Sequence, residues 1–267
     1  MKSMKLYSDV HRIYDNLAEL GIRAGDALDV AQLIPFDQYH YDGTDAVNLA
    51  LSRLAVAPGG HVLDIGAGIG GPARYMAQRA GVQVTALELQ PDLDAVARDL
   101  TARCGLADRV THVCGDILDG TARGPFDAII SMLCMLHIPD KARLFAACRV
   151  ALKPGQAMYI EDFACARPLT ATEADQLAVK VHCTDLPTPT EYRAHLHDAG
   201  FREVVLTDVT QDWCAVSANR VRAAQQGYAA NVALHGPDIV AGLMDFYVAV
   251  DQLWQGGALR GLRILAR

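Results

Sequence analysis

The stretch Val62-Leu63-Asp64-Ile65-Gly66-Ala67-Gly68-Ile69-Gly70-Gly71-Pro72-Ala73-Arg74 decides the fold. An apolar run ends near Asp64 and meets a glycine-rich turn, and a helical pattern follows at once. This order predicts a buried parallel strand that passes through a tight loop into a helix. Glycines let the loop backbone approach a ligand closely, and the first amides of the helix offer hydrogen-bond donors. We therefore expect a ligand-binding turn here.

Two kinds of cofactor-binding protein use such a turn. Gly66, Gly68 and Gly71 match the spacing G-x-G-x-x-G of dinucleotide-binding proteins. Asp64, Gly66, Gly68 and Gly70 match D-x-G-x-G-x-G, which resembles motif I of the class I S-adenosylmethionine (SAM)-dependent methyltransferases. Because a glycine pattern alone does not separate the two, the rest of the chain has to decide.

Composition describes a globular protein with a large core. The chain has 267 residues, of which 51% are hydrophobic and 21% charged, so one domain with insertions is the simplest organisation. The net charge of -7 argues against a nucleic-acid-binding surface and against binding to anionic membranes. No apolar run reaches the roughly 18 residues of a membrane span, and Met1–Tyr7 lacks the apolar centre of a signal peptide. We expect a cytoplasmic protein.

The seven cysteines are scattered along the chain, without a C-x-x-C pair. Most lie in apolar surroundings, as Cys134 does. This usage is typical of reduced, buried thiols in a cytoplasmic protein, so no metal site is expected.

Strands and helices alternate after Gly60, which predicts an α/β fold. Strands are expected at His61–Ile65, Val82–Leu87, Val110–Cys114, Phe126–Met132, Ala157–Asp162, Phe201–Val209 and Leu262–Ala266. A long helical block at about 211–257 separates the last two strands, which we expect to pair antiparallel at the sheet edge. The predicted fold is a Rossmann-like, seven-stranded, mostly parallel sheet with an antiparallel last strand and helices on both faces.

Four segments of one continuous domain follow from this pattern. Residues 1–57 form an N-terminal helical cap, and 58–169 form the Rossmann-like core. Residues 170–200 are a helical insertion. Residues 201–267 carry the last strands with an inserted helical lid.

Four landmarks together identify a resemblance to the class I SAM-dependent methyltransferases over roughly residues 36–209. Motif I is the first landmark, and Glu88 follows its first glycine by 22 positions. Asp116 comes after the third strand, and the turn 152–155 (Leu-Lys-Pro-Gly) precedes the fifth. The resemblance implies SAM as cofactor.

Each landmark has an implied role toward SAM. Glu88 would accept hydrogen bonds from the ribose hydroxyls, Asp116 would accept from the adenine amino group, and Ile117 would pack on the ring. Asp64 would orient the turn or take the ammonium group. The expected cofactor-binding residues are Asp64, Gly66, Ala67, Gly68, Gly70, Glu88, Leu89, Gln90, Asp116, Ile117 and Met132.

The segment 70–74 narrows the resemblance to small-molecule methyltransferases, closest in pattern to the sarcosine/dimethylglycine and phosphoethanolamine N-methyltransferases; sterol and tocopherol C-methyltransferases share it. Residues 131–137 resemble the phosphoethanolamine enzymes' segment that ends in a catalytic histidine, which implies that His137 is a base. Leu133 stands where those enzymes carry an aspartate, and their phosphate-binding pair falls on His182 and Thr184. This departure argues against a phosphobase and predicts a more apolar pocket.

The expected substrate-binding residues are Tyr39, His40, Tyr41, Leu133, Asp162 and His182. The expected function is SAM-dependent methyl transfer to a small molecule, with an amine favoured. C- or O-methylation of a lipophilic acceptor stays open, as do an NAD-dependent oxidoreductase and a SAM-binding protein without catalysis. The alternative to a catalytic role for His137 is a structural role as a core or helix-capping histidine. Nothing in the sequence indicates an oligomeric state.

Overall fold

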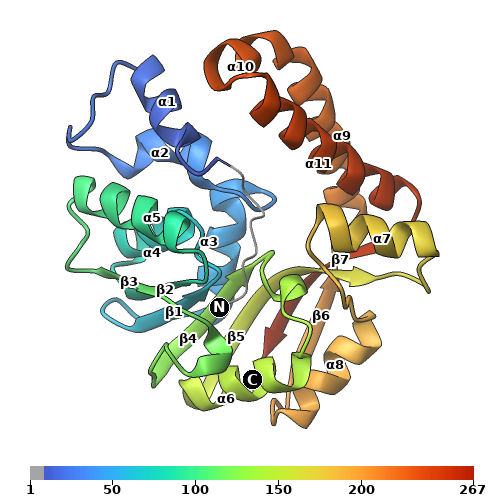
Figure 1. The fold of residues 1–267 in the computed structure, drawn as a ribbon. Helices are drawn as coiled ribbons and strands as arrows, with labels where there is room; N and C mark the ends of the chain where they lie inside the picture. Colours follow the sequence, from blue (N-terminus) through green and yellow to red (C-terminus); the bar gives the residue numbers. More distant parts are fainter. Residues whose placement is uncertain (1–8) are drawn as a thin grey trace.

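The sheet is the centre of the molecule in the computed structural model, which describes residues 9–267 (Figure 1). Its strand order is β3-β2-β1-β4-β5-β7-β6. The strands are β1 (His61–Ile65), β2 (Gln83–Glu88), β3 (Val110–Cys114), β4 (Phe126–Met132), β5 (Leu152–Cys165), β6 (Val204–Asp208) and β7 (Leu259–Ala266). The first five run parallel, and β7 lies antiparallel to both β5 and β6. The predicted fold class is confirmed. The segment Met1–Tyr7, for which the sequence predicts no signal peptide, lies outside the described residues.

Strand β5 is longer than predicted. The Lys-Pro-Gly segment at 153–155 was expected as a turn before the strand, but β5 already begins at Leu152. Leu152 pairs with Phe126, and the register then shifts before Ala128 pairs with Ala157. The Pro-Gly pair therefore lies in an irregular part of the strand, where a lost ladder hydrogen bond is tolerated.

Helices cover both faces of the sheet. Their bounds are α1 (Arg12–Glu19), α2 (Val30–Asp37), α3 (Gly43–Leu54), α4 (Gly71–Ala80), α5 (Pro91–Arg103), α6 (Lys141–Ala151), α7 (Ala171–Lys180), α8 (Pro189–Asp198), α9 (Thr210–Gln226), α10 (Tyr228–His235) and α11 (Pro237–Gln255), with short 3-10 turns η1 (Ile117–Asp119) and η2 (Met135–His137). Val47 of α3 and Met76 of α4 pack in the core on one face. Phe145 of α6 and Leu196 of α8 pack on the other.

A buried ion pair joins the N-terminal cap to the helix after the glycine turn. Arg74 Nη2 lies 2.9 Å from Asp37 Oδ2, and both side chains are fully buried. The carbonyl of Asp37 lies so close to Gly71 that an added Cβ would be 2.2 Å from it. Helix α2 can approach α4 in this way only because residue 71 is a glycine.

Helices α9, α10 and α11 form a lid that follows the end of β6 and leads into the start of β7 (Figure 1). Its base is an aromatic cluster in which Tyr41 stacks on Trp213 at 4.9 Å, and Trp254 Nε1 donates to Tyr41 Oη at 3.2 Å. Burial of such rings is a large apolar contribution to stability. Among the described residues, no helix combines the length and apolar character needed to cross a membrane.

Candidate active site

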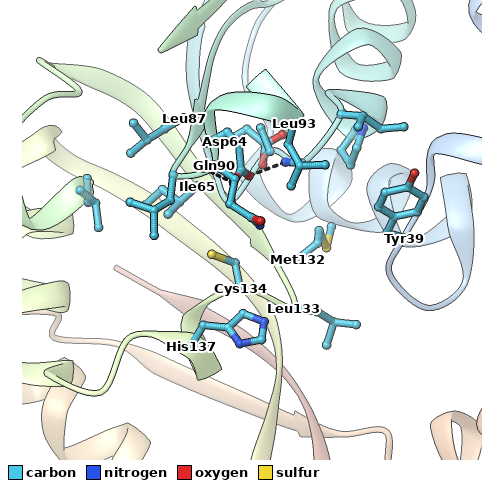
Figure 2. A pocket seen from close by; sticks show the side chains of 18 of the residues that line it. Tyr39, Asp64, Ile65, Leu87, Gln90, Leu93, Met132, Leu133, Cys134 and His137 are labelled. Atoms are coloured by element: carbon cyan, nitrogen blue, oxygen red, sulfur yellow. Dashed lines mark hydrogen bonds between the residues drawn. The ribbon is translucent and has the colours of Figure 1, made fainter. Parts of the chain in front are cut away.

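The main cavity opens at the carboxyl ends of β1, β2 and β4 (Figure 2). This is where open α/β sheets bind their ligands. Ten of the eleven predicted cofactor residues line it: Asp64, Gly66, Ala67, Gly68, Glu88, Leu89, Gln90, Asp116, Ile117 and Met132. Gly70 is outside the cavity wall; it adopts φ +80 as the residue before α4, with Arg74 packed against it. We call this space the cofactor cavity.

Glu88 organises the glycine turn. Its Oε2 accepts a hydrogen bond from Gly68 N at 2.8 Å, and its Oε1 accepts from Gln90 N at 2.9 Å. The turn needs glycine because Gly66 and Gly68 have φ values of +78 and +55. At Gly66, an added Cβ would also lie 2.3 Å from the Sγ of Cys134. This part of the cavity wall therefore consists of glycine backbone, which the carboxylate of Glu88 holds in place.

Two buried oxygens in this wall have no hydrogen-bond partner among the described residues: Asp64 Oδ2 and Gln90 Oε1. Burial raises the pKa of Asp64 to about 7, and the charge of Glu88 adds to the shift. Buried acceptors normally have partners, so two unpaired acceptors on a cavity wall indicate a ligand with N–H or O–H donors.

The far end of the cavity is apolar. Asp116 Oδ1 accepts from Leu118 N at 2.9 Å and thereby caps η1. This cap presents the buried Ile117 on the wall. A flat ring system fits such a surface, with one carboxylate at its edge.

A second cavity lies between the core and the lid, and we call it the acceptor cavity. It is lined by Tyr39, Tyr41, Leu133, Leu136, His137, Phe163, Val181, Ser217, Arg220, Phe246, Tyr247 and Val250. Tyr39, Leu133 and His137 line both cavities, so these three side chains form the junction between them. Figure 2 shows His137 across the cofactor cavity from Asp64 and Gln90.

His137 is a neutral imidazole in this setting. Burial lowers its pKa to about 4. Its Nδ1 lies 3.4 Å from the carbonyl oxygen of His182. Because a carbonyl only accepts, this contact assigns the proton to Nδ1 and leaves a lone pair on Nε2. His137 thus lies at the junction of two cavities, and its role as a base stays a prediction.

Two of the non-glycine residues with positive φ lie next to His137 or contact it. Leu133 and His182 both have φ of +54, a left-handed conformation that costs a non-glycine residue energy. Leu133 is held there by its N–H, which donates to Glu161 O at 2.8 Å. The strain orients the loop that leads to His137.

The other predicted substrate residues divide into two groups. Tyr41 lines the acceptor cavity, and His40 lines the cofactor cavity. His182 contributes its carbonyl to His137, and its side chain lies outside both linings. Asp162 also lies outside both, because its Oδ2 accepts from Tyr192 Oη at 2.6 Å and its Oδ1 from Phe163 N. Both carboxylate oxygens of Asp162 are thus bonded to protein donors, and we do not propose Asp162 as a substrate ligand.

Sequence reasoning missed Ser217 and Arg220 of the lid, and Asp37 and Cys134 of the cofactor cavity. Cys134 belongs to the segment 131–137, which the sequence pattern connects with the site through His137. The position of Cys134 in that segment was therefore a signal that could have identified it. Arg220 contacts His40 across 180 positions of sequence, and no local pattern announces such a contact.

Comparison with known proteins agrees with this geometry. A family model described as a methyltransferase domain matches residues 62–155. Phosphoethanolamine N-methyltransferase 3 of Arabidopsis thaliana is 32% identical over 69% of this chain and 37% of its own length. Sarcosine/dimethylglycine N-methyltransferase of Halorhodospira halochloris is 31% identical over 60% and 58%. The ubiquinone biosynthesis O-methyltransferase of Xanthomonas campestris is 34% identical over 60% and 68%. The chain thus spans about a third of the Arabidopsis relative.

Solved structures share the fold. Phosphoethanolamine N-methyltransferase 2 of Haemonchus contortus, in complex with SAM, has a TM-score of 0.79 at 22% identity, over 86% of this chain and 54% of that one. A cyclopropane synthase of Mycobacterium tuberculosis has a TM-score of 0.78 at 18% identity, over 98% and 96%.

The sheet, the cavity at motif I and these relatives together show that the chain belongs to the class I SAM-dependent methyltransferases. Members of this family are enzymes that use SAM as cofactor. The third glycine of the dinucleotide pattern, Gly71, is accounted for by its contact with Asp37.

Proposed function

We propose that this enzyme methylates a small-molecule amine held in the acceptor cavity. The observation that carries the proposal is the position of His137, which lines both cavities as a neutral imidazole. The two N-methyltransferase relatives support an amine as acceptor. The absence of an aspartate at position 133 distinguishes this site from the phosphoethanolamine pattern.

The cofactor cavity supplies the contacts for SAM. Asp64 takes the ammonium group of the methionine part, Glu88 takes the ribose hydroxyls with Gln90 beside it, and Asp116 and Ile117 hold the adenine. When bound, SAM supplies a methyl group on a positively charged sulfur, a leaving group that needs no further activation. The protein's task is then alignment of the nucleophile.

The acceptor cavity favours the unprotonated amine. No Asp or Glu of residues 9–267 lines it, and Arg220 contributes a positive charge. Both features disfavour an ammonium ion, which has no lone pair to attack with. Nε2 of His137 would accept the proton that the amine nitrogen loses when the methyl carbon bonds to that nitrogen and its bond to sulfur breaks.

C- or O-methylation remains a second candidate. The apolar and aromatic wall of the acceptor cavity favours it, and the O-methyltransferase relative is compatible with it.

The test is methyl transfer from labelled SAM to matched panels of amines, phenols and alkenes. We expect product from amines, and His137→Asn should lower turnover by about 10²- to 10⁴-fold, the usual contribution of a general base. His195→Asn, on α8 away from both cavities, is the control. Product from phenols or alkenes alone would contradict the amine acceptor and favour C- or O-methylation. Normal turnover in His137→Asn would contradict the role of His137 as a base.

A further inference from the structure

One permanent charge stands in the wall of the acceptor cavity. Of the residues that line it within the described chain, only Arg220 is fully charged at neutral pH; the rest are apolar, aromatic or hydroxyl-bearing, apart from the neutral His137. A charge placed against apolar walls is costly unless a counterion accompanies it.

Arg220 is held in place without a carboxylate. Its guanidinium lies 5.0 Å from the ring centre of Tyr41 and 5.7 Å from that of Tyr247. Its Nη2 donates to His40 O at 3.2 Å. Arg263, by contrast, binds Glu161 at 2.8 Å and Asp42 at 2.7 Å. In the described residues 9–267, no ion pair engages Arg220, so further N–H donors of its planar group remain for a ligand.

Arg220 also marks the way into the acceptor cavity. Arg220, Tyr39, Phe246 and Tyr247 line a wider cleft between α1–α2 and the lid as well as the acceptor cavity itself. His137 lines the acceptor cavity and the cofactor cavity but not this wider cleft. A ligand that spans the acceptor cavity therefore has one end near His137 and the other near Arg220.

We propose that the methyl acceptor carries a carboxylate, bound by Arg220 at the mouth of the acceptor cavity, while its apolar body lies between the aromatic rings and its reacting end faces His137. This rests on the proposed function in that the cavity holds the acceptor. A carboxylate is favoured over a phosphate because one guanidinium balances one negative charge and matches the planar carboxylate with paired hydrogen bonds. A phosphate would need a further cation within the acceptor cavity itself, whereas the other arginine nearby, Arg12, lines only the wider cleft.

The experiment measures binding rather than turnover. The full chain is saturated with S-adenosylhomocysteine and titrated calorimetrically with 4-phenylbutyrate, 4-phenylbutanol and 4-phenylbutylamine. These probes share a phenyl group on a four-carbon chain and differ in the charge of the end group. We expect the carboxylate to bind roughly ten- to hundredfold more tightly than the alcohol, as for a charge-assisted hydrogen-bonded pair.

Arg220→Gln should remove that preference while the affinity for S-adenosylhomocysteine stays the same. Arg222→Gln is the matched control, because Arg222 lies on the same helix, is exposed and bonds to Asn219. Equal or tighter binding of the alcohol or amine, binding of none of the probes, or an unchanged preference in Arg220→Gln would overturn the proposal. Failure of amine methylation with the carboxylate preference intact would refute the proposed function alone.

Discussion

Asp64 combines burial with an unpaired oxygen on a cavity wall, and this makes its protonation sensitive to the ligand. In the free protein, burial and the nearby Glu88 raise its pKa to about 7. A bound ammonium group favours the charged carboxylate and lowers that pKa again. Between about pH 5 and 7, SAM binding therefore has to release a proton that the free carboxyl holds.

We predict that SAM affinity falls as pH falls below about 7, by up to about tenfold per unit. Calorimetric titrations at pH 5.5, 6.5 and 7.5, in buffers of different ionisation enthalpy, measure both the affinity and the released proton. Asp64→Asn should flatten the profile and bind more weakly at pH 7.5. Glu88→Gln is the comparison, because burial raises the pKa of Glu88 as well. A slope that persists unchanged in Asp64→Asn would contradict the assignment.

The ion pair between α2 and α4 gives a second prediction, now at the scale of elements. Arg74 and Asp37 are both fully buried, and removing one partner leaves an uncompensated charge in the interior. Arg74→Met should lower the free energy of unfolding by about 3–5 kcal/mol, as measured by urea denaturation. Lys180→Met breaks the exposed pair with Asp245 and should cost under about 1 kcal/mol. Similar losses in both variants would contradict a larger contribution of the buried pair to the free energy of unfolding.

Lys141 links two loops at the acceptor cavity. Its buried ammonium donates to Ile138 O at 2.6 Å and to Asp185 O at 3.2 Å. The first carbonyl follows η2, which ends at His137, and the second belongs to the loop that carries His182. Burial lowers the pKa of Lys141, which reflects the cost of keeping this charge inside. The lysine therefore sets the spacing between His137 and the carbonyl that fixes its tautomer.

Lys141→Met should lower kcat by at least about tenfold, because small displacements of a catalytic group are costly, with S-adenosylhomocysteine affinity kept within about twofold. Steady-state kinetics and calorimetry on the same preparation separate the two effects. Lys153→Met, which breaks the more exposed contact of Lys153 with Asp127, is the matched control. An equal drop in both variants, or an unchanged kcat in Lys141→Met, would refute a positioning role.

At the scale of the whole molecule, the sheet and the helical lid were predictable, but the lid residues that line the acceptor cavity were not. Buried parallel strands are short apolar runs bounded by turns, so β1, β3 and β4 have the predicted bounds. The residues of the cofactor cavity could be predicted because most of them lie at or just after the carboxyl ends of strands. The acceptor cavity instead joins segments near positions 40, 135 and 220. Neighbouring residues of a strand point to opposite faces, and in β5, which continues past the predicted end at Asp162 to Cys165, this directs Asp162 toward Tyr192. Such long-range pairings leave no local pattern.

The two cavities draw on different parts of the chain, and this leads to a last prediction. All residues that line the cofactor cavity within the described chain lie between positions 37 and 138, whereas the lid contributes Phe246 and Val250 to the acceptor cavity. Glu88→Ala should weaken S-adenosylhomocysteine binding by about 1–3 kcal/mol, since it removes a charged acceptor. Phe246→Ala should leave that affinity within about twofold and raise KM for the acceptor, because it removes apolar contact area. Calorimetry and initial rates on both variants test the separation. A loss of cofactor affinity in Phe246→Ala comparable with that in Glu88→Ala would mean that the lid and the core bind their ligands as one unit.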